Sequence, residues 1–126
     1  MADILCIDDL EEILLTYKAY LKDDYELELC KDPEEGLELA LTGDYPVILL
    51  DMRMPGKSGL EIAGALEKEK VPCKCIMITS HATEYYSNEW AKSDIVYKYM
   101  IKPFKKQALV QAIEGAKEAL EKEIQG

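Results

Sequence analysis

Aspartates stand directly after two short apolar runs of this chain. Asp8 and Asp9 follow the run at residues 4–7, and Asp51 follows the run at residues 46–50. Carboxylates gathered near a protein surface repel one another by about 1–4 kcal/mol per pair, so such a group needs a cation. Hard carboxylate oxygens suit Mg²⁺, and one carboxylate can act as a nucleophile towards phosphorus. These residue types therefore point to metal-assisted phosphoryl chemistry centred on Asp51.

A hydroxyl and an amine end two further apolar runs. Thr79 follows residues 76–78, and Lys102 follows residues 99–101. A hydroxyl can donate to a phosphoryl oxygen, and an ammonium group neutralises the charge that such oxygens carry. Taken alone, an acidic pair before a helix is typical of a cap, and Asp51 before a turn is typical of an Asx-turn. The joint occurrence of these groups at the ends of separate runs favours a shared site.

Alternating strands and helices are predicted to bring these run ends together. The pattern predicts strands at residues 3–7, 25–30, 46–50, 72–79 and 97–101. It predicts helices at residues 10–22, from Pro33 to near Gly43, from Ser58 onward, at 83–92 and at 104–123. Strands that alternate with helices predict an α/β fold, with a five-stranded parallel sheet and helices on both faces. Ligands bind at the carboxyl edge of such sheets, where all the chemical groups above would lie.

The apolar pattern also orders the strands and orients two helices. Residues 46–50 form the most apolar strand and are predicted to be central, whereas residues 25–30 alternate with period two and are predicted to lie near an edge. The first helix should present one apolar face, consisting of Leu10, Ile13, Leu14, Tyr17 and Leu21. The last helix should pack one apolar face against the sheet. That face consists of Leu109, Ala112, Ile113, Ala116 and Leu120.

The composition is that of a soluble globular domain. The 126 residues are 48 % hydrophobic and 32 % charged, which predicts one domain with its own core, either free-standing or cut from a larger protein. The net charge of −10 disfavours direct binding to nucleic acid or to an anionic membrane. No signal-like segment and no apolar stretch of about 20 residues occurs. We therefore expect a cytoplasmic location.

The four cysteines have a structural interpretation and a chemical one. Cys6, Cys30, Cys73 and Cys75 lie in or beside apolar segments, which favours buried, reduced thiols that act as small hydrophobic side chains. The alternative is a metal or redox site at the C-x-C pair. With no second pair nearby, that spacing is a weak zinc signal.

Four pieces of the chain occur in a specific order and spacing: Ile4-Leu5-Cys6-Ile7-Asp8-Asp9, Leu50-Asp51-Met52-Arg53-Met54-Pro55-Gly56 with Gly59, Ile78-Thr79-Ser80, and Ile101-Lys102-Pro103-Phe104. With these pieces the chain resembles a response-regulator receiver domain of bacterial two-component signalling, over essentially its whole length. The resemblance implies a flavodoxin-like (βα)5 fold. It implies a signalling domain rather than an enzyme, one that catalyses only its own phosphorylation and dephosphorylation.

The resemblance also implies a role for each group. Asp51 would accept a phosphoryl group from a sensor histidine kinase or phosphotransfer protein. Mg²⁺ would be bound by Asp8, Asp9, Asp51 and the backbone carbonyl of Arg53. Lys102 would pair with the phosphoryl group, and its peptide bond to Pro103 would be cis. Thr79 and Tyr99 would form a switch pair. The small side chain of Ser80 would leave access to the phosphoryl group. Arg53 and His81 are candidate modulators of hydrolysis of the acyl phosphate.

Six of the ten aromatic residues lie between residues 85 and 104. They are Tyr85, Tyr86, Trp90, Tyr97, Tyr99 and Phe104. One interpretation is a partner surface on the fourth helix, fifth strand and fifth helix, because aromatic residues favour interface cores. The other is ordinary packing. The readout of phosphorylation would be an unknown downstream protein, an attached output domain, or a phosphorylation-dependent homodimer.

Three rival functions stay open. A receiver-like module could bind partner proteins independently of phosphorylation, although the complete set of chemical groups argues against it. A phosphatase with an aspartate nucleophile would need a second acid at position 53, which holds arginine. A flavin-binding protein would need a phosphate-binding loop after the first strand, where Asp8 and Asp9 would repel phosphate.

Overall fold

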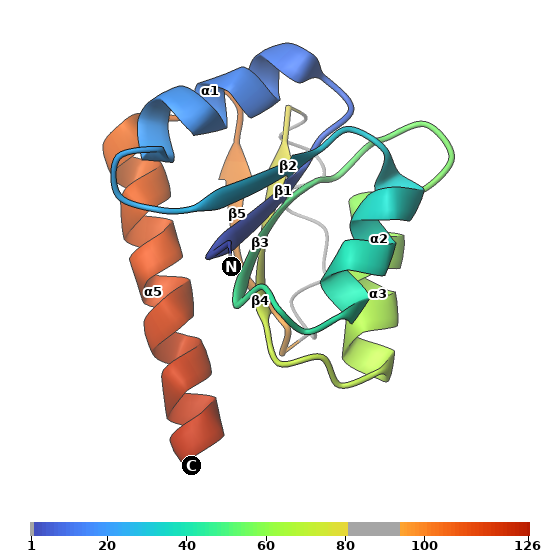
Figure 1. Cartoon of the computed structure of the whole chain (residues 1–126), viewed down its shortest axis with the longest axis vertical. Coiled ribbons are helices and arrows are strands. Elements are labelled where there is room, and N and C mark those ends of the chain that lie inside the picture. Colours follow the sequence, from blue (N-terminus) through green and yellow to red (C-terminus); the bar gives the residue numbers. More distant parts are fainter. Residues whose placement is uncertain (1, 81–93) are drawn as a thin grey trace.

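Five parallel strands form one sheet in the computed structural model, which describes residues 2–80 and 94–126 (Figure 1). The spatial order is β2-β1-β3-β4-β5. The strands are β1 (Ile4–Ile7), β2 (Leu27–Cys30), β3 (Val47–Asp51), β4 (Lys74–Thr79) and β5 (Val96–Ile101). The predicted parallel sheet is confirmed, with the most apolar strand at its centre and the alternating strand β2 at an edge.

Helices cover both faces of the sheet, as predicted. They are α1 (Glu11–Leu21), α2 (Pro33–Leu41), α3 (Gly59–Lys68) and α5 (Lys106–Gln125). Helices α1 and α5 lie on one face, and α2 and α3 lie on the other (Figure 1). The helix predicted at residues 83–92 lies outside the described residues.

Side-chain caps start two of the helices where the sequence predicts them. The carboxylate of Asp32 accepts a hydrogen bond from the Glu34 N–H at 3.3 Å, at the start of α2. The hydroxyl of Ser58 accepts one from the Glu61 N–H at 3.2 Å, at the start of α3. Gly43 follows the end of α2 with φ 79°, a conformation that glycine adopts without steric cost.

The apolar faces of two helices decide how they pack. All five residues predicted to face inward from α5 are buried. In α1, Leu14, Tyr17 and Leu21 are buried as predicted, but the prediction for Leu10 is wrong, because its side chain is 46 % exposed. Leu10 stands before the first helical turn, where the chain is still extended, so helical periodicity does not apply to it.

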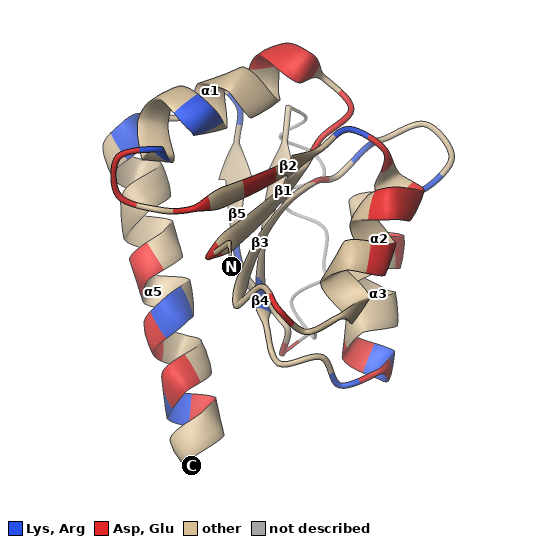
Figure 2. Cartoon of the chain, viewed as in Figure 1, with Lys and Arg blue, Asp and Glu red and all other residues tan. Residues whose placement is uncertain are grey.

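Charged residues are concentrated on the helices and the loops; the edge strand β2 carries Glu28, whereas β1 carries none (Figure 2). Strands covered on both faces read as continuous apolar runs, which is the pattern of β1 and β3. Among residues 2–80 and 94–126, no helix combines the length and the apolar character that crossing a bilayer requires.

The aromatic group predicted near the fifth strand is only partly described. Phe104 stacks on Tyr17 of α1, with ring centroids 5.8 Å apart, so its role is packing. Tyr97 is 41 % exposed on β5. Tyr85, Tyr86 and Trp90 lie outside the described residues, so the partner-surface interpretation stays a prediction.

Gly59 allows the first turn of α3 to lie directly against the end of β3. Its N–H donates to the Met52 carbonyl oxygen at 3.1 Å. A Cβ atom at this position would overlap the backbone carbonyl oxygen of Asp51. The close approach therefore depends on a residue without a side chain, and it fixes the backbone that carries Asp51.

We expect the substitution Gly59→Ala to lower the free energy of unfolding by about 1–3 kcal/mol, because the added methyl group overpacks this contact. Gly64 provides the matched control, since it lies in the same helix with no atom within 4 Å of an added Cβ. Gly64→Ala should raise stability by roughly 0.5–1 kcal/mol through helix propensity. Urea denaturation of both variants tests the pair, and equal effects would contradict the steric argument.

Candidate functional site

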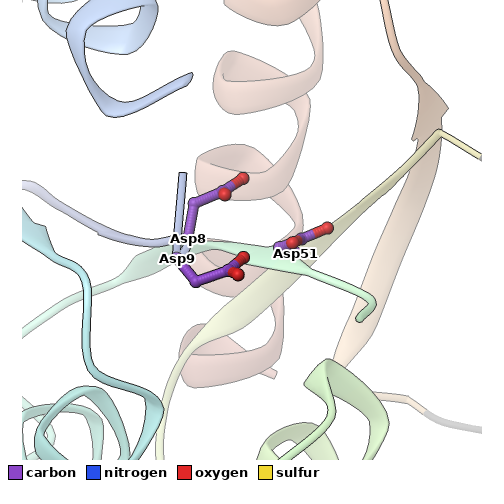
Figure 3. Close-up of side chains that lie close together, drawn as sticks. All are labelled: Asp8, Asp9 and Asp51. Carbon is purple, nitrogen blue, oxygen red and sulfur yellow. The ribbon is translucent and has the colours of Figure 1, made fainter. Parts of the chain in front are cut away.

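Three carboxylates converge at the carboxyl edge of the sheet (Figure 3). Asp8, Asp9 and Asp51 each offer an oxygen that lies within 4.8 Å of the others. Asp8 is fully buried, Asp51 is 6 % exposed, and Asp9 is partly buried. Three of the residues that the sequence predicts as metal ligands are thus brought together.

Strand pairing places these side chains. Ile7 is paired with Leu50, so the chain leaves β1 and β3 side by side and carries Asp8 next to Asp51. The Asp8 N–H continues the ladder by donating to the Cys30 carbonyl oxygen at 3.1 Å. Its carboxylate accepts a hydrogen bond from the N–H of Leu10 at 2.9 Å, in a turn that precedes α1. The N-cap of α1 is Leu10, without a side-chain cap, so the interpretation of the acidic pair as a helix cap is wrong.

Lys102 joins the cluster from the end of β5. Its Nζ lies 3.1 Å from Asp8 Oδ2 and 3.4 Å from Asp51 Oδ1. The Lys102 N–H donates to the Thr79 carbonyl oxygen at 2.7 Å, which anchors the lysine backbone to β4. The peptide bond between Lys102 and Pro103 is cis, as expected.

Burial makes this cluster electrostatically unfavourable. Burial raises the pKa of the Asp51 carboxyl from 3.8 to about 6, and the Asp8 carboxylate adds to the rise, while Lys102 opposes it. The pKa of Asp8 is also raised, chiefly by burial. One ammonium faces three carboxylates, so the donor set fits a divalent cation that prefers oxygen ligands.

An open pocket of about 210 Å³ lies above the cluster. Its lining residues are Asp9, Leu10, Asp51, Arg53, Thr79, Ser80 and Lys102. Thr79 is buried, whereas Arg53 and Ser80 are exposed at the rim. Leu10 is a pocket residue that sequence reasoning missed, although its position directly after the acidic pair could have indicated it. His81 lies outside the described residues.

Tyr99 lies on the same sheet face as Thr79, below the pocket. It is paired with Met77 of β4, two residues before Thr79, and residues two apart in a strand point to one face. Tyr99 packs against the core cluster that contains Met77. Burial raises the pKa of its hydroxyl to about 12. Thr79 and Tyr99, the residues predicted to form a switch pair, therefore lie on one face of the sheet.

Fold and site together define a flavodoxin-like receiver domain of two-component signalling, with strand order β2-β1-β3-β4-β5 and acids at the carboxyl edge. The model of the response regulator receiver domain matches residues 4–114. The chain belongs to this family.

Individual relatives agree with this assignment. The transcriptional regulatory protein SrrA of Staphylococcus aureus is 30 % identical over 114 residues, which are 90 % of this chain and 46 % of SrrA. The chain thus spans about half the length of the curated relatives it matches.

Solved structures give the same result. A receiver domain protein from Clostridium thermocellum has a TM-score of 0.84 and 28 % identity, with full coverage of both chains. TrrA from Thermotoga maritima, solved in complex with Mg²⁺ and BeF, has a TM-score of 0.80 and 32 % identity over 92 % of this chain and 99 % of TrrA.

We expect Asp51→Asn to stabilise the metal-free protein at neutral pH, because folding buries a charge that the amide lacks. The carboxyl binds its proton more tightly in the native state, with a pKa of about 6 against 3.8. The wild type therefore loses stability as the pH rises through this interval. The difference in unfolding free energy should reach about 2–3 kcal/mol above pH 7 and vanish below about pH 4.

Urea denaturation in EDTA across this pH range measures the difference. Asp44→Asn is the matched control, since Asp44 is an exposed carboxylate and should show little effect. A pH-independent gain in Asp51→Asn would contradict the electrostatic explanation.

Proposed function

We propose that this chain is a phosphorylation-controlled switch in which Asp51 takes a phosphoryl group from a sensor histidine kinase or phosphotransfer protein. The observation that carries the proposal is the position of Asp51 in the pocket, with two further acids and the Lys102 ammonium in contact range. The pocket is open at the rim, where Ser80 is small and exposed, so a donor side chain can approach.

In the transfer step, a carboxylate oxygen of Asp51 forms a bond to phosphorus. The bond between phosphorus and the donor nitrogen breaks, and the nitrogen keeps the electron pair. A pKa of about 6 leaves Asp51 mostly ionised at neutral pH, so the nucleophile needs no separate base. The negative charge is not lost in this step but passes to the phosphoryl oxygens, which carry it into the pocket beside Lys102.

Side chains around Asp51 have complementary roles in this proposal. Asp8, Asp9, Asp51 and the backbone carbonyl of Arg53 would hold Mg²⁺, which when bound neutralises charge on the phosphoryl oxygens. Lys102, already 3.4 Å from Asp51, supplies a second positive charge to the same oxygens. The relative TrrA was solved with Mg²⁺ and BeF, which supports this ligand set for the present chain.

The phosphorylated site would then be read out through Thr79 and Tyr99. The hydroxyl of Thr79 would donate to a phosphoryl oxygen, and Tyr99 would turn inward to fill the space behind it. Their shared sheet face supports this coupling. Such a change biases two existing conformations. The conformational change would alter the surface formed by β5, α5 and the helix expected at residues 83–92.

The altered face would control a partner protein, an attached output domain or a homodimer, in the cytoplasm. The match to SrrA supports an attached output domain, because the matched residues make up 46 % of SrrA. The net charge of −10 disfavours direct binding of nucleic acid by this chain. Arg53 at the pocket rim, and His81, are proposed to modulate hydrolysis of the acyl phosphate.

We expect Mg²⁺ to raise the midpoint of thermal unfolding of the wild type, because it binds only the folded carboxylate cluster. At about 100 times its dissociation constant, the gain is roughly 2.7 kcal/mol. Asp8→Asn and Asp9→Asn should abolish the gain, whereas Asp44→Asn should retain it. Measurement at constant ionic strength excludes general screening. No stabilisation at millimolar Mg²⁺ would favour a binding module that acts independently of phosphorylation.

Incubation with Mg²⁺ and acetyl phosphate should add the mass of one phosphoryl group to the wild type. The added mass should be absent in Asp51→Asn, because the amide is not a nucleophile, and retained in Asp44→Asn. Intact-protein mass spectrometry measures it. An equal gain in Asp51→Asn, or none in the wild type, would refute the proposal.

A further inference from the structure

A lysine is buried at the start of β4, at the end of the sheet opposite the acid cluster. The side chain of Lys74 is only 8 % exposed. Its Nζ donates a hydrogen bond to the Asp94 carbonyl oxygen at 2.6 Å and forms an ion pair with the carboxylate of Glu123 in α5. Removing an ammonium group from water is costly unless a counter-charge accompanies it. The carboxylate of Glu123 thus offsets a charge that would otherwise be buried alone.

The counter-ion of Lys74 approaches from the solvent side. Glu123 lies in the last turn of α5, and its side chain is 58 % exposed although its carboxylate contacts the buried ammonium group. The structure therefore contains a path that a carboxylate can take from solvent to Lys74. Water can hydrate Glu123 once it is released, so its exchange for another carboxylate leaves no buried charge unpaired.

A pocket of about 360 Å³ opens beside this ion pair, and Lys74 and Glu123 both line it. The pocket lies between the end of α3, the start of β4 and the last turns of α5. Pockets of about 300–1,000 Å³ with apolar walls and a few polar groups are typical of small-molecule sites. The apolar wall of this pocket consists of Val71, Pro72, Ile95, Leu120 and Ile124.

The polar lining of the pocket does not attract anions in general. Among the described residues that line it, three carry carboxylates and two carry ammonium groups, namely Glu67, Asp94 and Glu123 against Lys70 and Lys74. The Glu67 carboxylate accepts a hydrogen bond from the Asp94 N–H at 3.3 Å, which holds it beside the segment that precedes β5. Because the lining is negative as a whole, an anion binds only where it takes the place of Glu123 at Lys74.

We propose that this pocket binds a small monocarboxylic acid with an apolar body, for which octanoate is the probe. The carboxylate of the ligand pairs with Lys74 in place of Glu123, and its hydrocarbon chain covers the apolar wall. One carboxylate merely replaces another at the ammonium group, so the affinity comes from the hydrocarbon chain. Each buried methylene group tightens binding by about fourfold.

Binding would also change the end of α5. The ion pair with Lys74 joins the last turn of α5 to the start of β4. Exchange of the carboxylate releases this turn, and α5 belongs to the surface that is proposed to change on phosphorylation. The ligand would thus act on that surface from the end of the sheet that does not carry Asp51.

An NMR titration of the full ¹⁵N-labelled chain with octanoate, at constant ionic strength, tests the site. We expect saturable amide shifts at Val71, Ile95 and Ile124, with one octanoate bound per chain. Hexanoate should bind roughly fifteenfold more weakly, because it lacks two methylene groups. Octan-1-ol should also bind more weakly than octanoate, since an alcohol cannot replace a carboxylate at an ammonium group.

Three variants identify the groups that hold the carboxylate. Lys74→Met removes the ammonium group and should weaken octanoate binding to the level of octan-1-ol or below. Glu123→Gln removes the internal competitor and should tighten octanoate binding about two- to fivefold, the range of an exposed ion pair. The matched control is Glu121→Gln, which makes the same charge change in the same helix at a residue outside the pocket lining, and it should bind as the wild type does.

Circular dichroism reports whether Lys74→Met is folded, and Glu123→Gln and the shorter acid test the proposal even if it is not. Four results would each overturn it: octan-1-ol binding as tightly as octanoate, unchanged binding in Glu123→Gln, undiminished octanoate binding in folded Lys74→Met, or no saturable shifts at millimolar octanoate. Asp51→Asn should bind octanoate unchanged, so a failed phosphorylation test leaves this result independent.

Discussion

The structure depends on holding three carboxylates and one ammonium group together at a largely buried position. Asp8 and Asp51 lie within contact range of Lys102, yet both carboxyl pKa values are raised, so the ammonium group does not fully compensate for burial and mutual repulsion. A cluster of this kind spreads apart unless the surrounding backbone prevents it. The remainder of the fold supplies that restraint.

The restraint comes from backbone contacts that do not depend on charge. Strand pairing fixes Asp8 beside Asp51, and the Lys102 N–H is bonded to Thr79. Gly59 brings α3 against the carbonyl of Asp51. Apolar strands buried on both faces provide the stability that the polar site lacks. The protein thus keeps an unfavourable charge arrangement that a bound cation would offset.

Strand β4 links two chemically different ends of the sheet. Thr79 lies at its carboxyl end, in the hard-oxygen environment of the acid cluster. Cys73 and Cys75 lie at its amino end, where both thiols are buried. Strand β4 is paired on both sides, so its two ends are held apart.

Sequence alone determined the features that follow from local chemistry. The alternation of apolar runs and amphipathic stretches determined the parallel sheet, its central and edge strands and the inward face of α5, because burial on both faces demands those patterns. Residues at the run ends identified the acid cluster, because parallel strands share one carboxyl edge. Only the tertiary structure decided what depends on distance: the contact of Lys102 with both Asp8 and Asp51, the exposure of Leu10 and the approach of Gly59. The cysteine spacing was ambiguous in the same way, because periodicity tells which face a thiol takes but not whether a pocket opens beside it.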